Sequence, residues 1–297
     1  MFQFILARDL APALLGSLLL LAACTGPARN DADSAPVDTA PEDTLPAGDY
    51  DFADEQAIAD AYFSIFMPSY STVMETMAST KGRGFGCPVI TESDDGYVAT
   101  AGEGCTADDD IYHFRGTLEV DWSVQGQWYM QADEFAFDIE HDFLGLEIDG
   151  MMEITYGEDP TPNGVFEADD YTVRAFGPLF PWNDTAWPDP REFAATYSGF
   201  SDRIVARDAA AERYDETFEG SVQIEGAGSF GVSGSAYWDG TQPCLLYPNQ
   251  GEVVLNGVQR LTVRWTDAGC EQYTADYALD DGREGVLSLS GNIPMYY

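Results

Sequence analysis

Apolar and polar residues alternate along most of the chain from Cys87 onward. In the stretch 112–122 the even-numbered residues are apolar apart from one glycine, and most residues between them are charged or polar. The same two-residue period recurs at 131–140, 144–156, 165–175, 230–238 and 260–265. Because neighbouring side chains of a strand point to opposite faces, the pattern predicts antiparallel strands with one buried and one solvated face.

The number and spacing of these segments define the fold class. Roughly a dozen short strands with short turns predict a mainly β domain in which the strands follow one another as an antiparallel meander. Such a meander either forms a two-layer sandwich or curls as one long, partly closed sheet. The alternation by itself does not choose between these two architectures.

The residues before the first strand have a helical period. Asp51 can cap a helix in which Ile58, Ala61 and Ile65 share one face. Pro68 interrupts the pattern, and helical spacing resumes over 70–77. We therefore expect one or two N-terminal helices that pack on the sheet.

The amino-terminal residues have the pattern of an export signal. The run from Leu10 to Ala23 has 14 residues without a charge. As a helix it would be about 21 Å long, which is shorter than the roughly 30 Å hydrocarbon core of a bilayer. Residues 1–23 are therefore interpreted as a signal peptide and not as a membrane span.

The run ends in Leu21-Ala22-Ala23-Cys24, which resembles the lipobox of bacterial lipoproteins. The resemblance implies cleavage after Ala23 and acylation of Cys24, which would hold the protein in a membrane through several acyl chains. It also implies a cell-envelope location, and Thr25 in place of an aspartate favours the outer over the inner membrane. The alternative is an ordinary secretory signal in which Cys24 is incidental.

Residues 24–50 form the predicted tether. From residue 25 on they contain four prolines and six acidic residues against a single arginine, with little apolar bulk. Such a composition cannot offset the entropy of ordering by burial, so we expect a disordered, extended linker. The folded domain is then predicted to span 51–297.

One part of that domain does not alternate. Residues 177–217 contain four prolines, two tryptophans and an Ala-Ala-Ala run. They are predicted to form an irregular insertion. Trp182 and Trp187 are candidate ligand-binding residues, because indole rings can stack on a sugar or grip a partner. The competing interpretation is that both rings plug the end of the sheet.

Four cysteines follow Cys24, namely Cys87, Cys105, Cys244 and Cys270. An even number of cysteines after an export signal indicates disulfides. The first two are symmetric about the turn signal Asp95-Gly96, and the last two about Asn256-Gly257. We therefore predict the bonds Cys87–Cys105 and Cys244–Cys270, and no metal site on these cysteines, since no CxxC pair is present.

The charge of the chain restricts its partners. With 52 acidic residues and 13 basic ones, the formal net charge is −39. Nucleic-acid binding and a polybasic membrane contact both need a cationic surface and are excluded. Acid runs at 108–110, 169–170 and 280–281 make calcium the one cofactor to consider, although we favour the interpretation that they are solvated turn acids. Otherwise no cofactor is predicted.

No catalytic motif is present. The chain has two histidines, and neither belongs to a recognisable nucleophile or metal signature. The sequence therefore predicts a lipid-anchored envelope protein with a non-catalytic binding or structural role, whose protein or glycan partner it does not identify. Two alternatives stay open. An open groove lined by Tyr112, Phe114, Leu146 and Ile148 would indicate a carrier of a lipid or other apolar ligand. Two acids at glycosidase separation, one with a raised pKa, would indicate a carboxylate-based hydrolase.

Overall fold

A computed structural model of the chain describes residues 47–65, 86–107, 112–139, 144–156, 164–176, 192–208, 213–239, 248–267, 269 and 274–288. All of them belong to one compact unit, Thr44–Tyr297. The described residues contain one α-helix, α3 (Glu55–Ser64), and thirteen β-strands. No helix among them has the length and apolar composition needed to cross a bilayer.

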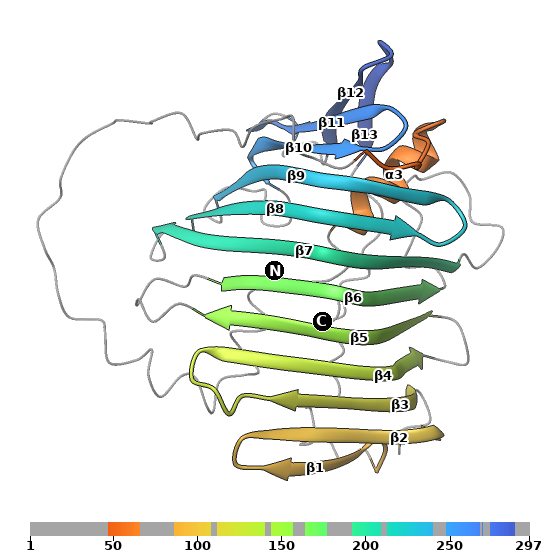
Figure 1. Cartoon of the computed structure of the whole chain (residues 1–297), viewed down its shortest axis with the longest axis vertical. Helices are drawn as coiled ribbons and strands as arrows, with labels where there is room; N and C mark the ends of the chain where they lie inside the picture. Colours follow the sequence, from red (N-terminus) through yellow and green to blue (C-terminus); the bar gives the residue numbers. More distant parts are fainter. Residues whose placement is uncertain are drawn as a thin grey trace, which may run out of the picture. The chain divides into compact units, whose positions relative to one another are not determined.

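The thirteen strands form one antiparallel sheet in which each strand pairs with the next in the chain. Their bounds are β1 (Val89–Ser93), β2 (Gly96–Thr106), β3 (Tyr112–Asp121), β4 (Gln127–Ile139), β5 (Leu144–Tyr156), β6 (Gly164–Phe176), β7 (Glu192–Asp208), β8 (Arg213–Ile224), β9 (Gly228–Asp239), β10 (Gln250–Asn256), β11 (Arg260–Trp265), β12 (Thr274–Leu279) and β13 (Glu284–Ser288). Figure 1 shows β1 to β11 stacked in this order, with β1 at the bottom and the hairpin of β12 and β13 toward the top. The predicted mainly β meander is confirmed.

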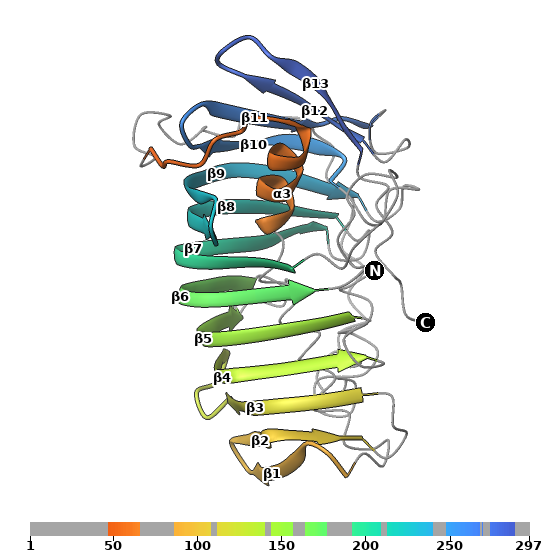
Figure 2. The ribbon, with the colours of Figure 1, turned by 90° about the vertical axis from the view of Figure 1, so that its right-hand side faces the viewer.

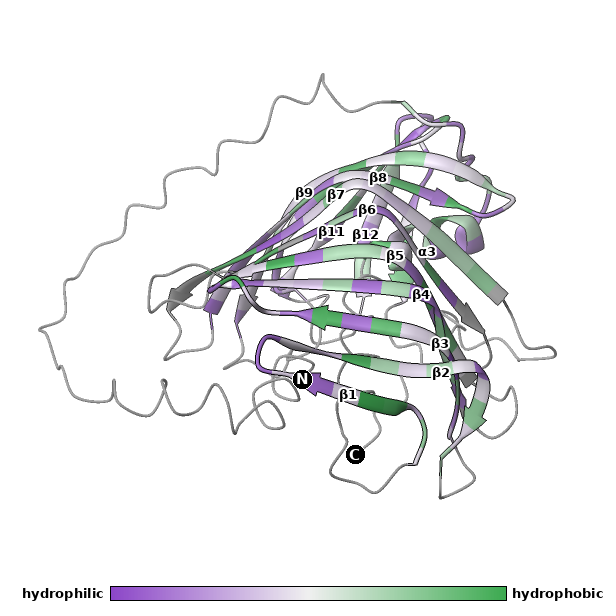
Figure 3. Cartoon of the chain, turned by 60° about the horizontal axis from the view of Figure 1, so that its bottom comes forward, coloured by the Kyte–Doolittle hydropathy of each residue, from purple (hydrophilic) through white to green (hydrophobic). Residues whose placement is uncertain are grey.

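The architecture is a single curled sheet and not a two-layer sandwich. Within the described residues no pairing joins β13 to β1, so the sheet is not closed. Its apolar and polar residues alternate along the strands (Figure 3). On β3, for example, Phe114 and Leu118 are buried while Arg115 and Glu119 are exposed. The buried side chains gather on one face, which we call the inner face.

The curl follows a line of backbone irregularities across the middle of the sheet. One residue on each strand from β3 to β8 has a positive φ angle: Gly116, Glu134, Gly150, Asp170, Gly199 and Gly220. The pairing register shifts beside most of them. An extra residue on one strand of a pair bends that strand and increases its twist. We call these six residues the bend line, and Figure 3 shows strands that turn part-way along their length.

Aspartates support the bend line from the solvated face. Asp149 Oδ1 accepts a hydrogen bond from the backbone N–H of Glu134 at 3.2 Å. Asp169 Oδ1 accepts from the backbone N–H of Gly199 at 3.0 Å. Each bulge leaves a backbone donor without a ladder partner, and these carboxylates satisfy two of those donors.

Helix α3 packs on the inner face of the C-terminal part of the sheet (Figure 2). Tyr62 Oη accepts a hydrogen bond from Trp265 Nε1 at 2.8 Å, and Ile58 and Ala61 are buried as the helical period predicts. The predicted cap at Asp51 is wrong. Asp54 caps the helix instead, and its Oδ1 accepts from the N–H of Ala57 at 2.9 Å. The second helical stretch, beyond Pro68, lies outside the described residues.

The segment 48–53, which we call the strap, joins three hairpin ends of the sheet. The Gly48 N–H donates to the carbonyl of Asn256 at 3.0 Å, and the Tyr50 N–H donates to the carbonyl of Ser229 at 2.9 Å. Asp51, predicted to cap the helix, accepts from Gln259 Nε2 at 2.9 Å. The strap is therefore tied to β9, to the end of β10 and to the β10–β11 loop.

Aromatic packing fixes the strap. Tyr50 is 3% and Phe52 0% exposed, and both rings pack against Phe230 with centroids 5.4 and 6.1 Å away. Arg283 Nη1 donates to the carbonyls of Phe52 and Ala53, each at 2.8 Å. The predicted tether, which ran to residue 50, is therefore too long at its end. Tyr50 supplies the apolar burial that orders this segment.

The predicted irregular insertion at 177–217 is also corrected. Residues 192–208 form β7, the longest strand, and β8 begins at Arg213. The bulge at Gly199 hides the alternation, because the buried positions change from Ala195 and Tyr197 to Phe200. Residues 177–191 and 209–212 lie outside the described residues.

Candidate functional site

Several predicted site residues lie outside the described part of the chain. These are Cys24, Trp182, Trp187, Cys244 and Cys270. The anchor, the indole-based ligand site and the second disulfide therefore stay predictions.

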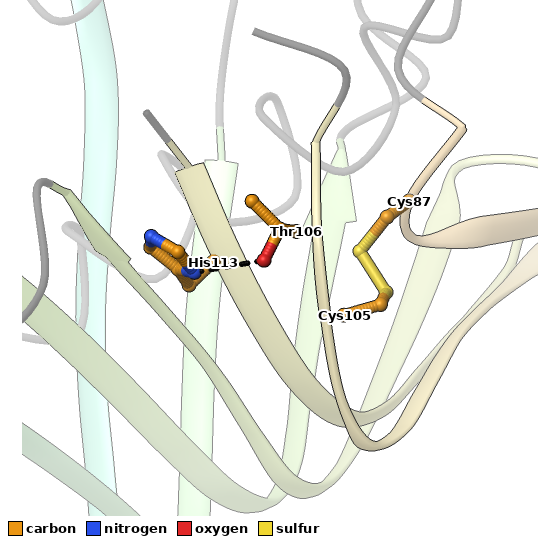
Figure 4. Close-up of a disulfide and its surroundings, with 4 residues drawn as sticks. All are labelled: Cys87, Cys105, Thr106 and His113. Carbon is orange, nitrogen blue, oxygen red and sulfur yellow. Dashed lines mark hydrogen bonds between the residues drawn. A yellow bond between two sulfur atoms is a disulfide. The ribbon is translucent and has the colours of Figure 1, made fainter. Parts of the chain in front are cut away.

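The predicted Cys87–Cys105 disulfide is present (Figure 4), with 5.8 Å between its Cα atoms. The hairpin it closes turns at Asp94-Asp95, since Ser93 pairs with Gly96. In the regular register of this hairpin Cys87 would lie opposite Gly102. Irregular backbone in β2, including a positive φ at Gly102, lets Cys105 reach it instead. The bond ties the segment before β1 to the far end of β2.

His113 lies beside this disulfide in Figure 4. Its Nδ1 is 3.0 Å from Thr106 Oγ1, and the two residues are directly paired across β2 and β3. The contact is a cross-strand polar pair of the kind that stabilises a sheet. It brings no serine or cysteine nucleophile to the imidazole.

The most unusual group of side chains is an acidic pair on β7 and β8, in which Glu216 is buried and Asp202 is half-buried. Asp202 is opposite Phe218 in the pairing register, and Glu216 is opposite Ile204. The two acids are therefore diagonal neighbours on one face of the sheet. That face is the inner one, because Phe218 is buried there at 2% exposure and lies two residues from Glu216.

Trp238 on β9 completes the cluster. Glu216 pairs with Ala236, so Trp238 is its diagonal neighbour on the side opposite Asp202. Trp238 Nε1 donates a hydrogen bond to Glu216 Oε2. The carboxyl of Asp202 lies within hydrogen-bonding reach of that of Glu216, while its Oδ1 is buried without a hydrogen-bond partner. We call Asp202, Glu216 and Trp238 the carboxyl cluster.

Burial controls the protonation of this cluster. It raises the pKa of Glu216 to about 7, although the hydrogen bonds from Trp238 and Asp202 act in the opposite direction. It also raises the pKa of Asp202 well above its ordinary value, and the charge of Glu216 and the hydrogen bond to it raise the pKa further. The shared hydrogen bond therefore has a protonated Asp202 as donor and Glu216 as acceptor.

No cation compensates these two acids among the described residues. The described ion pairs lie elsewhere: Arg115–Glu147, Arg174–Glu147, Arg174–Glu225, Arg213–Asp239, Arg264–Glu252 and Arg283–Asp281. A buried carboxyl without a cation keeps its proton, because the charged form is poorly solvated. The cluster is thus held together by shared protons and not by opposite charges.

Sequence reasoning missed this cluster, although its signal is visible. Glu216 occupies an inner position between Tyr214 and Phe218, and Asp202 lies between Phe200 and Ile204. An acid in the apolar phase of an alternating strand is the signal. The prediction of an irregular insertion over residues 177–217 hides this signal, because it assigns no strand there.

The described residues contain no candidate site for calcium, the one cofactor that the sequence brings into consideration. No group of three or more histidine, cysteine, aspartate or glutamate side chains is arranged there to hold a metal ion. Asp169 instead accepts from Gly199 N–H, and Asp281 pairs with Arg283. The run at 108–110 lies outside the described residues.

The apolar groove that would indicate a carrier is not open. Phe114, Leu146 and Ile148 are 3%, 5% and 0% exposed, and only Tyr112 is half-buried.

No protein-family model matches this chain, and no curated protein or solved structure is significantly similar to it.

Proposed function

We propose that this chain is a lipid-anchored cell-envelope protein, more specifically of the outer membrane, whose folded part has a non-catalytic binding or structural role. The lipobox-like Leu21-Ala22-Ala23-Cys24 and the acidic, proline-rich segment after it support the anchor and the tether. The disulfide Cys87–Cys105 supports an oxidising compartment outside the cytosol.

The observation that favours this role over the carrier alternative is the burial of the side chains on the inner face. An apolar ligand needs a concave, accessible site lined by apolar side chains. The side chains predicted to line such a site are buried in the core, with Ile148 at 0% and Phe114 at 3% exposure. The solvated outer face, which is available for contact with a partner, is polar and acidic.

The hydrolase alternative is favoured by one observation and opposed by another. The raised pKa values of Asp202 and Glu216 are what a carboxylate mechanism needs in its general acid. The two carboxyls, however, are hydrogen-bonded to each other. Glycosidases hold theirs about 5 to 9.5 Å apart, so that a sugar carbon or a water fits between them. The spacing therefore supports a structural use of the pair.

Metabolic labelling tests the anchor. The full chain is expressed in bacteria supplied with an alkyne analogue of palmitate, beside a Cys24→Ser variant that keeps the leader. We expect label only on the wild-type protein, with mass spectrometry showing that the chain begins at Cys24. Unlabelled wild-type protein that retains Met1 would overturn the proposal.

Two measurements on the Cys24→Ser variant, which carries no acyl chain of its own, test the role of the domain. We expect no stoichiometric lipid after organic extraction of the purified protein, and no glycan hydrolysis. One bound lipid per chain would instead establish the carrier. Hydrolysis that disappears in a Cys24→Ser/Glu216→Gln double variant would instead establish the hydrolase.

A further inference from the structure

The carboxyl cluster occupies a particular place in the sheet. Asp202 follows Gly199 and Glu216 precedes Gly220, so both acids lie between the bend line and the turn that joins β7 to β8. Trp238 holds the same position on β9, opposite Tyr214. The cluster thus connects three adjacent strands on one side of the bend.

Apolar packing is thinner on this side. Ile204, Tyr214 and Trp238 are only partly buried on the inner face, whereas Tyr197 and Val222, on the other side of the bend line, are fully buried. Segments with few buried apolar side chains open locally at the lowest free energy. The hydrogen bonds of the cluster therefore contribute a large part of the local stability of these strand ends.

The groups that face the cluster do not include a cation among the described residues. In the pairing register Phe166 of β6 is opposite Asp202, and the neighbours on the inner face are Ile204 of β7, Tyr214 and Phe218 of β8 and Ala236 of β9. Helix α3 also contacts β8. The titratable side chains of α3 are Glu55, Asp60 and Tyr62; Asp60 accepts from Gln56 at 2.8 Å and Tyr62 accepts from Trp265 at 2.8 Å.

We propose that Asp202, Glu216 and Trp238 form a pH-sensitive latch, which holds the ends of β7, β8 and β9 together in acidic medium and releases them as the pH rises to neutral and above. With Asp202 protonated, its carboxyl donates to Glu216 and every strand in the cluster is bridged. When Glu216 ionises, a full charge lies in an apolar site, where only the Asp202 hydroxyl and the Trp238 indole donate to it among the described residues. When Asp202 also ionises, two carboxylates repel each other at contact distance.

The direction of the effect follows from proton linkage. The folded state binds the proton of Glu216 more tightly than the unfolded state, since burial raises its pKa from 4.5 to about 7. Unfolding therefore releases a proton between these two values, and stability falls as the pH rises through that window. Below pH 4.5 the latch is closed, and above about pH 7 the contribution of Glu216 to folding stability is fully lost. The lipid anchor plays no part in this inference.

Hydrogen exchange of the full chain at pH 5 to 8.5, corrected for intrinsic exchange rates, tests the latch. The variant Glu216→Gln keeps an acceptor for Trp238 but cannot ionise. Glu219→Gln, on the exposed face of the same strand, is the matched control. We expect amides of 202–208, 213–218 and 234–239 to lose protection roughly tenfold or more as the pH rises in wild type and Glu219→Gln, and no such loss in Glu216→Gln. Equal pH profiles for wild type and Glu216→Gln would overturn the proposal.

A second measurement needs no variant that might fail to fold. The indole Nε1–H resonance of Trp238, assigned in the wild-type chain by NMR, reports the charge of its acceptor directly. We expect it to shift with a midpoint between pH 6 and 8, about two or more pH units above the ordinary titration of a glutamate. An indole resonance that is unchanged from pH 5 to 8.5, or that titrates near pH 4.5, would also overturn the latch.

Discussion

The two edges of the sheet are secured in different ways. Near β1 a disulfide joins Cys87 to Cys105, which are 18 residues apart. Near β13 the strap is held by contacts between residues more than 200 positions apart, such as Phe52 with Gln259 and with Arg283. The first restraint is local and covalent, while the second exists only after nearly the whole chain has folded.

This difference separates two kinds of stabilisation. A disulfide acts largely by restricting the unfolded chain, so its effect is set by loop length. The strap acts in the folded state, by burying Tyr50 and Phe52 against Phe230 and by completing backbone hydrogen bonds. The C-terminal edge therefore depends on residues at the amino-terminal end of the folded unit.

The largest expected effect comes from removing the strap's anchor. Phe52 is fully buried, so Phe52→Ala should destabilise the protein by about 4 kcal/mol, from lost transfer energy and the cavity left behind. Urea unfolding measures this loss. The control Val286→Ala, at a side chain 58% exposed on β13, should change stability by less than about 0.5 kcal/mol. Equal effects of the two changes would show that the strap does not support this edge.

The opposite edge should respond next. Cys87→Ser and Cys105→Ser should each lower stability by about 3 kcal/mol, the value expected for a loop of this length. The double variant should be no less stable than either single one, because one bond is lost in all three. Thermal unfolding of the three variants checks this. Additive losses would mean that each cysteine acts on its own and that the bond is not formed in the protein.

The comparison also explains what could be predicted from the sequence. The hairpin with Cys87 and Cys105 was accessible because its turn, its alternation and its cysteines all lie within twenty residues. The strap was not, because Tyr50 stands at the end of a proline-rich acidic segment and its partners lie some 180 residues away. Composition predicts a disordered tether, but it does not indicate where burial begins.

The candidate site was missed for a related reason. Period-two analysis assumes an unbroken strand, and the bend line breaks it on β7, where the buried positions shift from Tyr197 to Phe200. If the alternation set by Tyr197 is continued along β7, Asp202 is assigned to the solvated face. β5, two strands away, keeps its phase across Gly150, with Ile148 and Met152 both buried, so its alternation predicts the strand correctly.

The bend between the two edges gives the next effect. A Cβ at Gly150 would lie 2.5 Å from the carbonyl oxygen of Asp170, at a φ of 101°. Gly150→Ala should therefore destabilise by about 3 kcal/mol through strain and overpacking. Gly199 has a φ of 52° and open space around its Cβ position, so Gly199→Ala should lose only about 1 kcal/mol. Urea unfolding of both variants tests whether close approach, and not φ alone, makes glycine necessary on β5.

The smallest effect expected has the opposite sign. Glu134 has a φ of 45°, which is strained for any side chain except glycine by about 1 kcal/mol or more. Glu134→Gly should relieve this strain. Part of the gain in stability is cancelled because glycine has more conformational entropy in the unfolded chain, so the net stabilisation should be about 0.5 kcal/mol. The backbone N–H still donates to Asp149 after the change.

Glu119→Gly makes the same chemical change at an exposed position on β3, directly paired with Gln131, in ordinary extended backbone. It should destabilise by about 1 kcal/mol, because glycine weakens a regular strand. Opposite signs in urea unfolding would locate the cost of curvature in the backbone of the bend line. If both variants lose stability equally, Glu134 contributes through its side chain, and the bend is held by packing on the inner face instead.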